Sequence, residues 1–153
     1  MFMRFNRLMA TFFYIGYLPL APGTMASLAG AALAVIFYGN APAYIAVFIA
    51  LTILGFLTSG SVEKMIGKKD PGCIVIDEVA GVMIAFWMLP LTAPVLISAF
   101  FLFRAFDMFK IYPANTFESI PGGVGIMMDD IVAGLYANII MHLALALTGP
   151  ILL

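Results

Sequence analysis

Five acidic residues stand at the ends of otherwise apolar stretches or inside them, and carboxylates in such places are candidates for chemistry. They are Asp77, Glu78, Asp107, Asp129 and Asp130. Charged side chains at membrane depth are expensive, and they persist mainly where they pair, bind ions or line a polar site. Carboxylate oxygens are hard ligands of the kind that Mg²⁺ prefers. The acids therefore predict a divalent-metal site.

Two basic residues among these acids predict an anion partner. Arg104 stands three positions before Asp107, so the two share a face of a helix, and Lys110 follows. Guanidinium and ammonium groups form strong charge-assisted hydrogen bonds with phosphate, so the combined inventory points to phosphate chemistry. Two structural alternatives stay open. Acids also stabilise helix N-termini without any chemistry, and Arg104 with Asp107 could be a purely structural ion pair.

The composition places these residues in a membrane protein. Of 153 residues, 64% are hydrophobic and 10% charged, and the mean hydropathy is +1.12, far above that of soluble domains. No charged residue lies between Arg7 and Glu63, between Glu78 and Arg104, or after Asp130. This pattern excludes a nucleic-acid-binding surface and a disordered tail. A single cysteine, Cys73, excludes an intramolecular disulfide framework.

Two membrane spans and a lead-in segment are expected in the charge-free stretch between Arg7 and Glu63. A span needs about 20 apolar residues. We expect helices over residues 24–38 and 42–61 with a turn at 39–41, and an interfacial or re-entrant segment over residues 8–20. The N-terminus is predicted to be retained and membrane-inserted, not cleaved as a signal peptide.

The later segments are expected to form a hairpin and one further span. Pro90 and Pro94 favour two helical arms, over residues 74–89 and 92–110, instead of a single span from 79 to 103. A final span over residues 131–147 would end at Gly149 and Pro150. The sequence thus predicts an all-α protein, a polytopic membrane helical bundle with about five membrane segments including a helical hairpin, in one domain over residues 1–153.

This topology brings the charges together. It places the charged clusters at residues 4–7, 63–78 and 104–130 on one side, with all seven Lys and Arg residues. The positive-inside rule assigns that side to the cytoplasm. Small residues beside the acids would let the helices approach closely; they are Gly81, Ala133, Gly134 and Ala137.

Four stretches, in their order and spacing, resemble the phosphatidylglycerophosphatase A family of membrane enzymes. They are APGTMASL (21–28), IVIDE (74–78), FRAFD (103–107) with Lys110, and GGVGIMMDDIVAG (122–134). The family removes the terminal phosphate from phosphatidylglycerophosphate and depends on Mg²⁺. The resemblance implies that activity and cofactor, a lipid substrate among membrane lipids, no nucleic-acid partner, and a multi-pass protein of the bacterial plasma (inner) membrane whose active site faces the cytoplasm.

The resemblance also implies roles for particular residues. Its functional acids carry over as catalytic and metal-binding residues onto Asp77, Glu78, Asp107, Asp129 and Asp130. Phosphate contacts are expected from Arg104, Lys110, Thr24 and Ser27. The chain departs from the family where Ala26 replaces a usual glycine and where Ile111 replaces a proline. The residue types leave open whether the nucleophile is metal-activated water or a carboxylate.

Other functions fit the sequence less well. A cysteine phosphatase would need arginine where Val79 stands, and a haloacid-dehalogenase-type enzyme would need an Asp-x-Asp pair. The histidine-dependent lipid phosphatases need more than one histidine, and the lone His142 is expected to be a polar packing residue or a near-interface group. A CDP-alcohol phosphotransferase remains the main alternative among enzymes, although its Asp-Gly and Ala-Arg pairs are absent. A small channel or transporter is the alternative from another class, and the charge-free loops on the opposite side argue against it.

Overall fold

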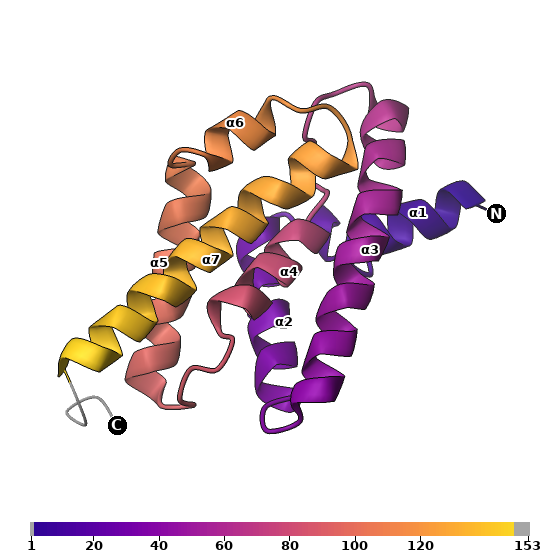
Figure 1. Ribbon diagram of the computed structural model, residues 1–153. Coiled ribbons are helices and arrows are strands. Elements are labelled where there is room, and N and C mark those ends of the chain that lie inside the picture. Colours follow the sequence, from indigo (N-terminus) through magenta and orange to yellow (C-terminus); the bar gives the residue numbers. More distant parts are fainter. Residues whose placement is uncertain (1, 149–153) are drawn as a thin grey trace.

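The computed structural model describes residues 2–148, and every regular element in that range is helical (Figure 1). The elements are α1 (Phe2–Ala10), a short 3-10 helix η1 (Ile15–Tyr17), α2 (Pro22–Ile36), α3 (Ala41–Ile66), α4 (Ile76–Ala85), α5 (Ala93–Phe109), α6 (Ala114–Glu118) and α7 (Gly123–Thr148). The all-α prediction is confirmed. The expected helix end at Gly149 and Pro150 lies outside the described residues.

Helix α4 lies in the middle of the bundle, between α2, α3, α5 and α7 (Figure 1). Nearly all of its residues are buried. A Cβ atom on Gly81 would lie 2.8 Å from the carbonyl oxygen of Asp130, and one on Gly134 would collide with the carbonyl oxygen of Gly81. The backbones of α4 and α7 are therefore in contact, as the small residues predicted. This contact brings the acids of the two helices together.

The N-terminal part of α2 packs on the other side of α4. Ala26 is fully buried against Val75 and Val79. The alanine that replaces the family's usual glycine is thus accommodated in a close apolar contact. Further along, a Cβ atom on Gly30 would lie 2.6 Å from the carbonyl oxygen of Val79, so the two helices stay close.

Helix lengths differ from the expected ones in three places. Helices α3 and α7 have 26 residues each, about 39 Å, and are the two described helices long and apolar enough to cross a membrane. Helix α7 begins at Gly123 instead of residue 131, so its acids lie inside the helix. Helix α3 continues to Ile66, beyond the expected end at 61.

The third difference is α4, which covers 10 residues of the arm expected over 74–89. Proline disfavours the helical conformation of the residue before it, so Pro90 favours an early end. The Asn138 side chain of α7 satisfies carbonyl groups that this end exposes, because it donates hydrogen bonds to the carbonyl oxygens of Ala85 (3.2 Å) and Trp87 (2.8 Å).

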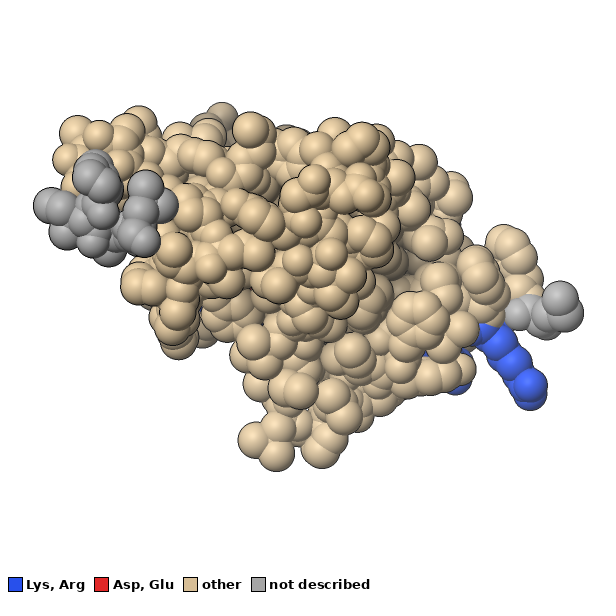
Figure 2. All heavy atoms as spheres, turned by 90° about the horizontal axis from the view of Figure 1, so that it is seen from below, with Lys and Arg blue, Asp and Glu red and all other residues tan. Residues whose placement is uncertain are grey.

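The helices alternate in direction, so one end of the bundle collects the charged residues. Helices α2, α4 and α7 begin at this end of the bundle, and helices α3 and α5 end there (Figure 1). The loops at 37–40 and 86–92 lie at the opposite end. In Figure 2, which views the molecule from that opposite end, no Asp or Glu is visible and Lys or Arg shows at one edge only.

The N-terminal segment folds onto the charged end. Helix α1, which the sequence did not predict, ends at Ala10 and packs against α3. The chain then turns through Phe12, Phe13 and Tyr14, all with positive φ. The carbonyl oxygen of Ala10 accepts a hydrogen bond from the backbone N–H of Val75 at 2.9 Å. This segment therefore supports the loop that leads into α4. Its expected interfacial or re-entrant position in the membrane stays a prediction.

Candidate active site

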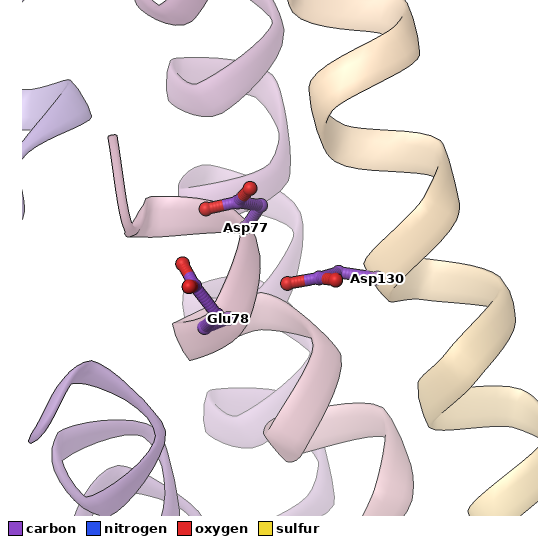
Figure 3. A group of neighbouring side chains, drawn as sticks. All are labelled: Asp77, Glu78 and Asp130. Carbon is purple, nitrogen blue, oxygen red and sulfur yellow. The ribbon is translucent and has the colours of Figure 1, made fainter. Parts of the chain in front are cut away.

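Three carboxylates converge at the start of α4 (Figure 3). Asp77 and Glu78 lie in the first turn of α4, and Asp130 points at them from α7. One oxygen of each lies within 4.8 Å of the others. Asp77 is 7% exposed and Asp130 is 3% exposed. We call these residues the three-acid group.

The three-acid group has the properties expected of a cation site. Oδ1 of Asp77 and Oε2 of Glu78 are buried without a hydrogen-bond partner. Buried carboxylates that face one another and lack partners are unfavourable unless a cation or protons compensate their charge. Convergent carboxylate oxygens form the ligand set that suits Mg²⁺, so the side chains present fit that ion.

An arginine lies beside the three-acid group and is held from two sides. Arg104 Nη1 forms an ion pair with Asp107 Oδ2 at 2.6 Å and donates a hydrogen bond to Ser27 Oγ at 3.3 Å. The Ser27 hydroxyl donates in turn to the carbonyl oxygen of Gly23 at 2.8 Å. The guanidinium is therefore fixed between α5 and the first turns of α2.

Gly23 brings this arginine next to the acids. A Cβ atom at this position would collide with Oε1 of Glu78 and would lie 3.5 Å from Nη2 of Arg104. The negative charge of Asp107 is also close enough to interact with those of Glu78 and Asp130. A phosphate at this place would meet both a positively charged donor and the three-acid group.

A second group of charged side chains lies next to the first, and its members are paired. Lys110 Nζ lies 2.8 Å from Asp129 Oδ2 and 3.8 Å from Asp70 Oδ2. The other oxygen of Asp129 accepts a hydrogen bond from the backbone N–H of Asp130 at 3.0 Å. We call Lys110, Asp129 and Asp70 the lysine group.

Lys110 occupies a particular backbone position. It follows the last residue of α5 and adopts the left-handed conformation, with φ of 44°. That conformation ends a helix, and glycine usually occupies it because a side chain adds strain. A lysine in this position keeps the turn and adds the ammonium group that contacts Asp129.

Sequence reasoning missed one buried acid, Glu63. It is 9% exposed; its Oε1 accepts a hydrogen bond from the backbone N–H of Asp70 at 3.1 Å, and its Oε2 accepts one from Gly122 at 2.9 Å. It therefore joins the loop after α3 to the loop before α7. Its position in the sequence could have drawn attention to it, because the helix dipole disfavours a negative charge in the last turn of a helix such as α3.

Comparison with known proteins identifies the family. A family model described as phosphatidylglycerophosphatase A matches residues 8–145. The chain belongs to the phosphatidylglycerophosphatase A family. This membership favours the phosphatase interpretation over the phosphotransferase and the channel.

Curated relatives of the phosphatidylglycerophosphatase A family cover most of the chain. A Haemophilus influenzae protein named phosphatidylglycerophosphatase A is 39% identical over 140 residues, which are 88% of this chain and 85% of that protein. An Escherichia coli K12 protein of the same name is 35% identical over 147 residues, or 88% and 80%. A Bacteroides thetaiotaomicron protein, provisionally named phosphatidylinositol-3-phosphatase, is 33% identical over 150 residues, or 90% and 91%. No solved structure gives a significant match.

The structure divides the residues expected from the phosphatidylglycerophosphatase A resemblance into separate groups. Of the five acids, three form the three-acid group, Asp107 pairs with Arg104, and Asp129 pairs with Lys110. Thr24 is half-buried in the first turn of α2, next to Gly23. Ligand and phosphate-binding roles for all these side chains stay predictions.

His142 lies far from these acids along α7. Its Nε2 is 3.2 Å from the carbonyl oxygen of Trp87, in the loop at the charge-free end. His142 is exposed and makes this backbone contact, which is compatible with both expected roles, a polar packing residue and a near-interface group.

Proposed function

We propose that this chain is a Mg²⁺-dependent membrane phosphatase that hydrolyses phosphatidylglycerophosphate to phosphatidylglycerol and inorganic phosphate. Family membership and the names of the Haemophilus influenzae and Escherichia coli relatives support the reaction and the lipid substrate. The three-acid group, with two buried and unpartnered carboxylate oxygens, supports the metal.

Each charged side chain has a role in this proposal. Asp77, Glu78 and Asp130 would hold Mg²⁺, which supplies positive charge to the phosphate oxygens as the P–O bond breaks. Arg104 donates hydrogen bonds to the phosphate, and Asp107 with Ser27 orients its guanidinium. Thr24, on the same turn as Gly23, would contact the headgroup.

The lysine group acts on the three-acid group through the backbone. Lys110 holds one oxygen of Asp129, and the other oxygen accepts from the N–H of Asp130. Fixing this segment of α7 fixes the direction of the Asp130 side chain. A contact of Lys110 with the phosphate, which the sequence predicted, remains part of this proposal.

The proposed topology has five membrane segments with the charged end in the cytoplasm. These segments are α2, α3, the hairpin of α4 and α5, and α7. The alternating helix directions and the near absence of charge at the opposite end support this arrangement. α4, with 10 residues, would be about 15 Å long and would enter the membrane without crossing it by itself.

Cysteine labelling tests the topology. In a Cys73→Ser background, single cysteines replace the exposed residues Ser119, Lys68 and Asn40, and an impermeant thiol reagent is added to sealed vesicles of known orientation. We expect Ser119→Cys and Lys68→Cys to react from the same side and Asn40→Cys from the other. Reaction of Ser119→Cys from the side opposite to Lys68→Cys would contradict the hairpin.

A second candidate substrate is a phosphoinositide, because the Bacteroides thetaiotaomicron relative is named for one. Both lipids carry a phosphomonoester on a polyol headgroup, which the same charged groups could bind. The two are compared by phosphate release from each lipid in detergent, with Mg²⁺ and with a chelator. We expect release from phosphatidylglycerophosphate only when Mg²⁺ is present. Preference for phosphatidylinositol 3-phosphate would contradict the proposed substrate. Phosphate release in the presence of the chelator would contradict the proposed dependence on Mg²⁺.

A further inference from the structure

An apolar groove runs along the outside of the bundle between α2 and α5. It has a volume of about 590 Å³, and its lining side chains are all apolar. Leu28, Ala32 and Val35 line it from α2, and Ile97, Phe100 and Phe101 line it from α5. Leu28, Ala32, Val35, Ile97 and Phe101 are also exposed at the surface, so the groove is open to the surrounding lipid.

One end of the groove is lined by residues that lie next to those of the candidate active site along α2 and α5. Leu28 follows Ser27 directly, and Phe101 precedes Arg104 by three residues, one helical turn. The hydrogen bond between Arg104 and Ser27 therefore spans the same two helices at the end of the groove. From Leu28 to Ile36 the groove follows α2 for about 12 Å toward the charge-free end.

We propose that this groove binds one acyl chain of the lipid substrate while the phosphomonoester lies at Arg104 and the three-acid group. The inference rests on the proposed function, because the substrate brings an acyl chain only if the reacting phosphate belongs to a lipid. The chain then runs along α2 and α5, away from the charged end. The groove thereby orients the phosphate toward the acids, and orientation of a reacting group lowers its barrier.

A second apolar pocket provides a comparison. It lies between α3, α4 and α7, has a volume of about 270 Å³, and includes Tyr44, Trp87 and Asn138 among its lining residues. These residues belong to the charge-free half of the bundle, and the lining residue nearest in sequence to Asp130 is Leu135. Because this pocket lies near the C-terminal end of α4, it is not connected with Arg104.

A groove-filling substitution tests the proposal. Ala32→Phe places a large side chain in the groove from an exposed position on α2, and Ala50→Phe makes the same change at an exposed position on α3 that lines neither pocket. The substrates are dioleoyl and dihexanoyl phosphatidylglycerophosphate in mixed micelles. Since acyl chains already lie among apolar neighbours in lipid, the groove contributes packing contacts, not removal from water.

We expect Ala32→Phe to raise KM for the dioleoyl substrate about fivefold through lost packing contacts and to leave the dihexanoyl substrate within about twofold, since the short chain barely enters the groove. Ala50→Phe should resemble the wild type with both. Equal kinetics of the two variants with the dioleoyl substrate would overturn the proposal.

Photolabelling of the wild-type protein tests the groove without any variant, and its readout does not depend on turnover. The probe is phosphatidylglycerophosphate with a diazirine in the middle of one acyl chain, in phosphatidylethanolamine vesicles. We expect labelled peptides from α2 and α5, with protection by unlabelled phosphatidylglycerophosphate but not by additional phosphatidylethanolamine. Labelling spread over α3 as well, without such protection, would overturn the groove. Protected labelling of α2 and α5 without phosphate release would support the groove and overturn the proposed function.

Discussion

The three-acid group and the lysine group contain consecutive residues of one helix, Asp130 and Asp129, in opposite electrostatic situations. Asp130 faces two other carboxylates, whereas Asp129 contacts an ammonium group at 2.8 Å. The three-acid group contains no positively charged member, whereas in the lysine group one ammonium group offsets part of the charge of two carboxylates. Adjacent residues of a helix are turned by about 100° from each other, and in α7 this turn separates the side chains of Asp129 and Asp130, whereas the adjacent Asp77 and Glu78 in the first turn of α4 both reach the three-acid group. The doubled acid of α7 can thus supply one ligand for the proposed metal, Asp130, and one side chain, Asp129, that holds this ligand in position.

The largest expected effect comes from Asp130→Asn. The amide keeps the size of the side chain but removes one negative charge from the three-acid group. We expect phosphate release to fall by about 10³-fold or more, since a catalytic metal supplies several kcal/mol of stabilisation. Binding of Mn²⁺, followed by electron paramagnetic resonance, should weaken in parallel. Full activity together with unchanged Mn²⁺ binding would remove Asp130 from the metal site.

Gly23→Ala should have the next largest effect, because it disturbs the three-acid group without changing any charge. The new methyl group would collide with the carboxylate of Glu78, so this carboxylate must shift from its position beside Asp77 and Asp130. A misplacement of about 1 Å at a reacting centre lowers the rate by about 10²-fold, and we expect a loss of that size in kcat.

Gly72→Ala is the matched control for Gly23→Ala, since a Cβ atom at Gly72 would meet open space. Its rate of phosphate release should equal that of the wild type. If Gly23→Ala also kept full activity, the α2 turn would not be close to Glu78 in the working enzyme.

Asp129→Asn tests the lysine group directly and should be milder than Asp130→Asn. Loss of a partner that orients a metal ligand typically lowers affinity or activity by about 10- to 100-fold. We expect a rate loss of about 10-fold, at the lower end of this range. The reason is that the amide oxygen of the new asparagine can still accept the hydrogen bond from the backbone N–H of Asp130. Side-by-side rates of the two asparagine variants at saturating Mg²⁺ provide the measurement. A larger loss of rate for Asp129→Asn than for Asp130→Asn would contradict the assignment of Asp130 as the metal ligand and Asp129 as the residue that positions it.

The sequence predicted the fold class and the gathering of charges at one end better than it predicted how the acids are grouped. The all-α class, the close contact at Gly81 and Gly134, and the gathering of charges at one end follow from hydropathy, small residues and chain direction. The division of the acids does not, because it depends on where α7 begins. With the helix expected from residue 131, Asp129 and Asp130 would precede it, whereas a start at Gly123 places them on two faces of the helix.

The role of Glu63 could not be predicted from the sequence, because its hydrogen-bond partners are backbone groups. Its two hydrogen bonds go to the N–H groups of Asp70 and Gly122, and residue types cannot reveal which backbone N–H lacks a partner. Through Asp70 it contacts the lysine group, and through Gly122 the start of α7. It thus supports both groups from the loops and touches no residue of the three-acid group directly.

Glu63→Gln should have the smallest effect on catalysis and a measurable effect on stability. A glutamine side chain has one acceptor oxygen, so it can keep one of the two hydrogen bonds and sets an N–H donor against the other backbone N–H. We expect the free energy of unfolding in detergent to fall by about 1–3 kcal/mol and the rate to fall only a few-fold. Lys64→Gln, at the exposed neighbouring position, is the control and should leave both unchanged. If Glu63→Gln instead lost as much activity as Asp130→Asn without loss of stability, Glu63 would belong with the three-acid group and not with the residues that support it.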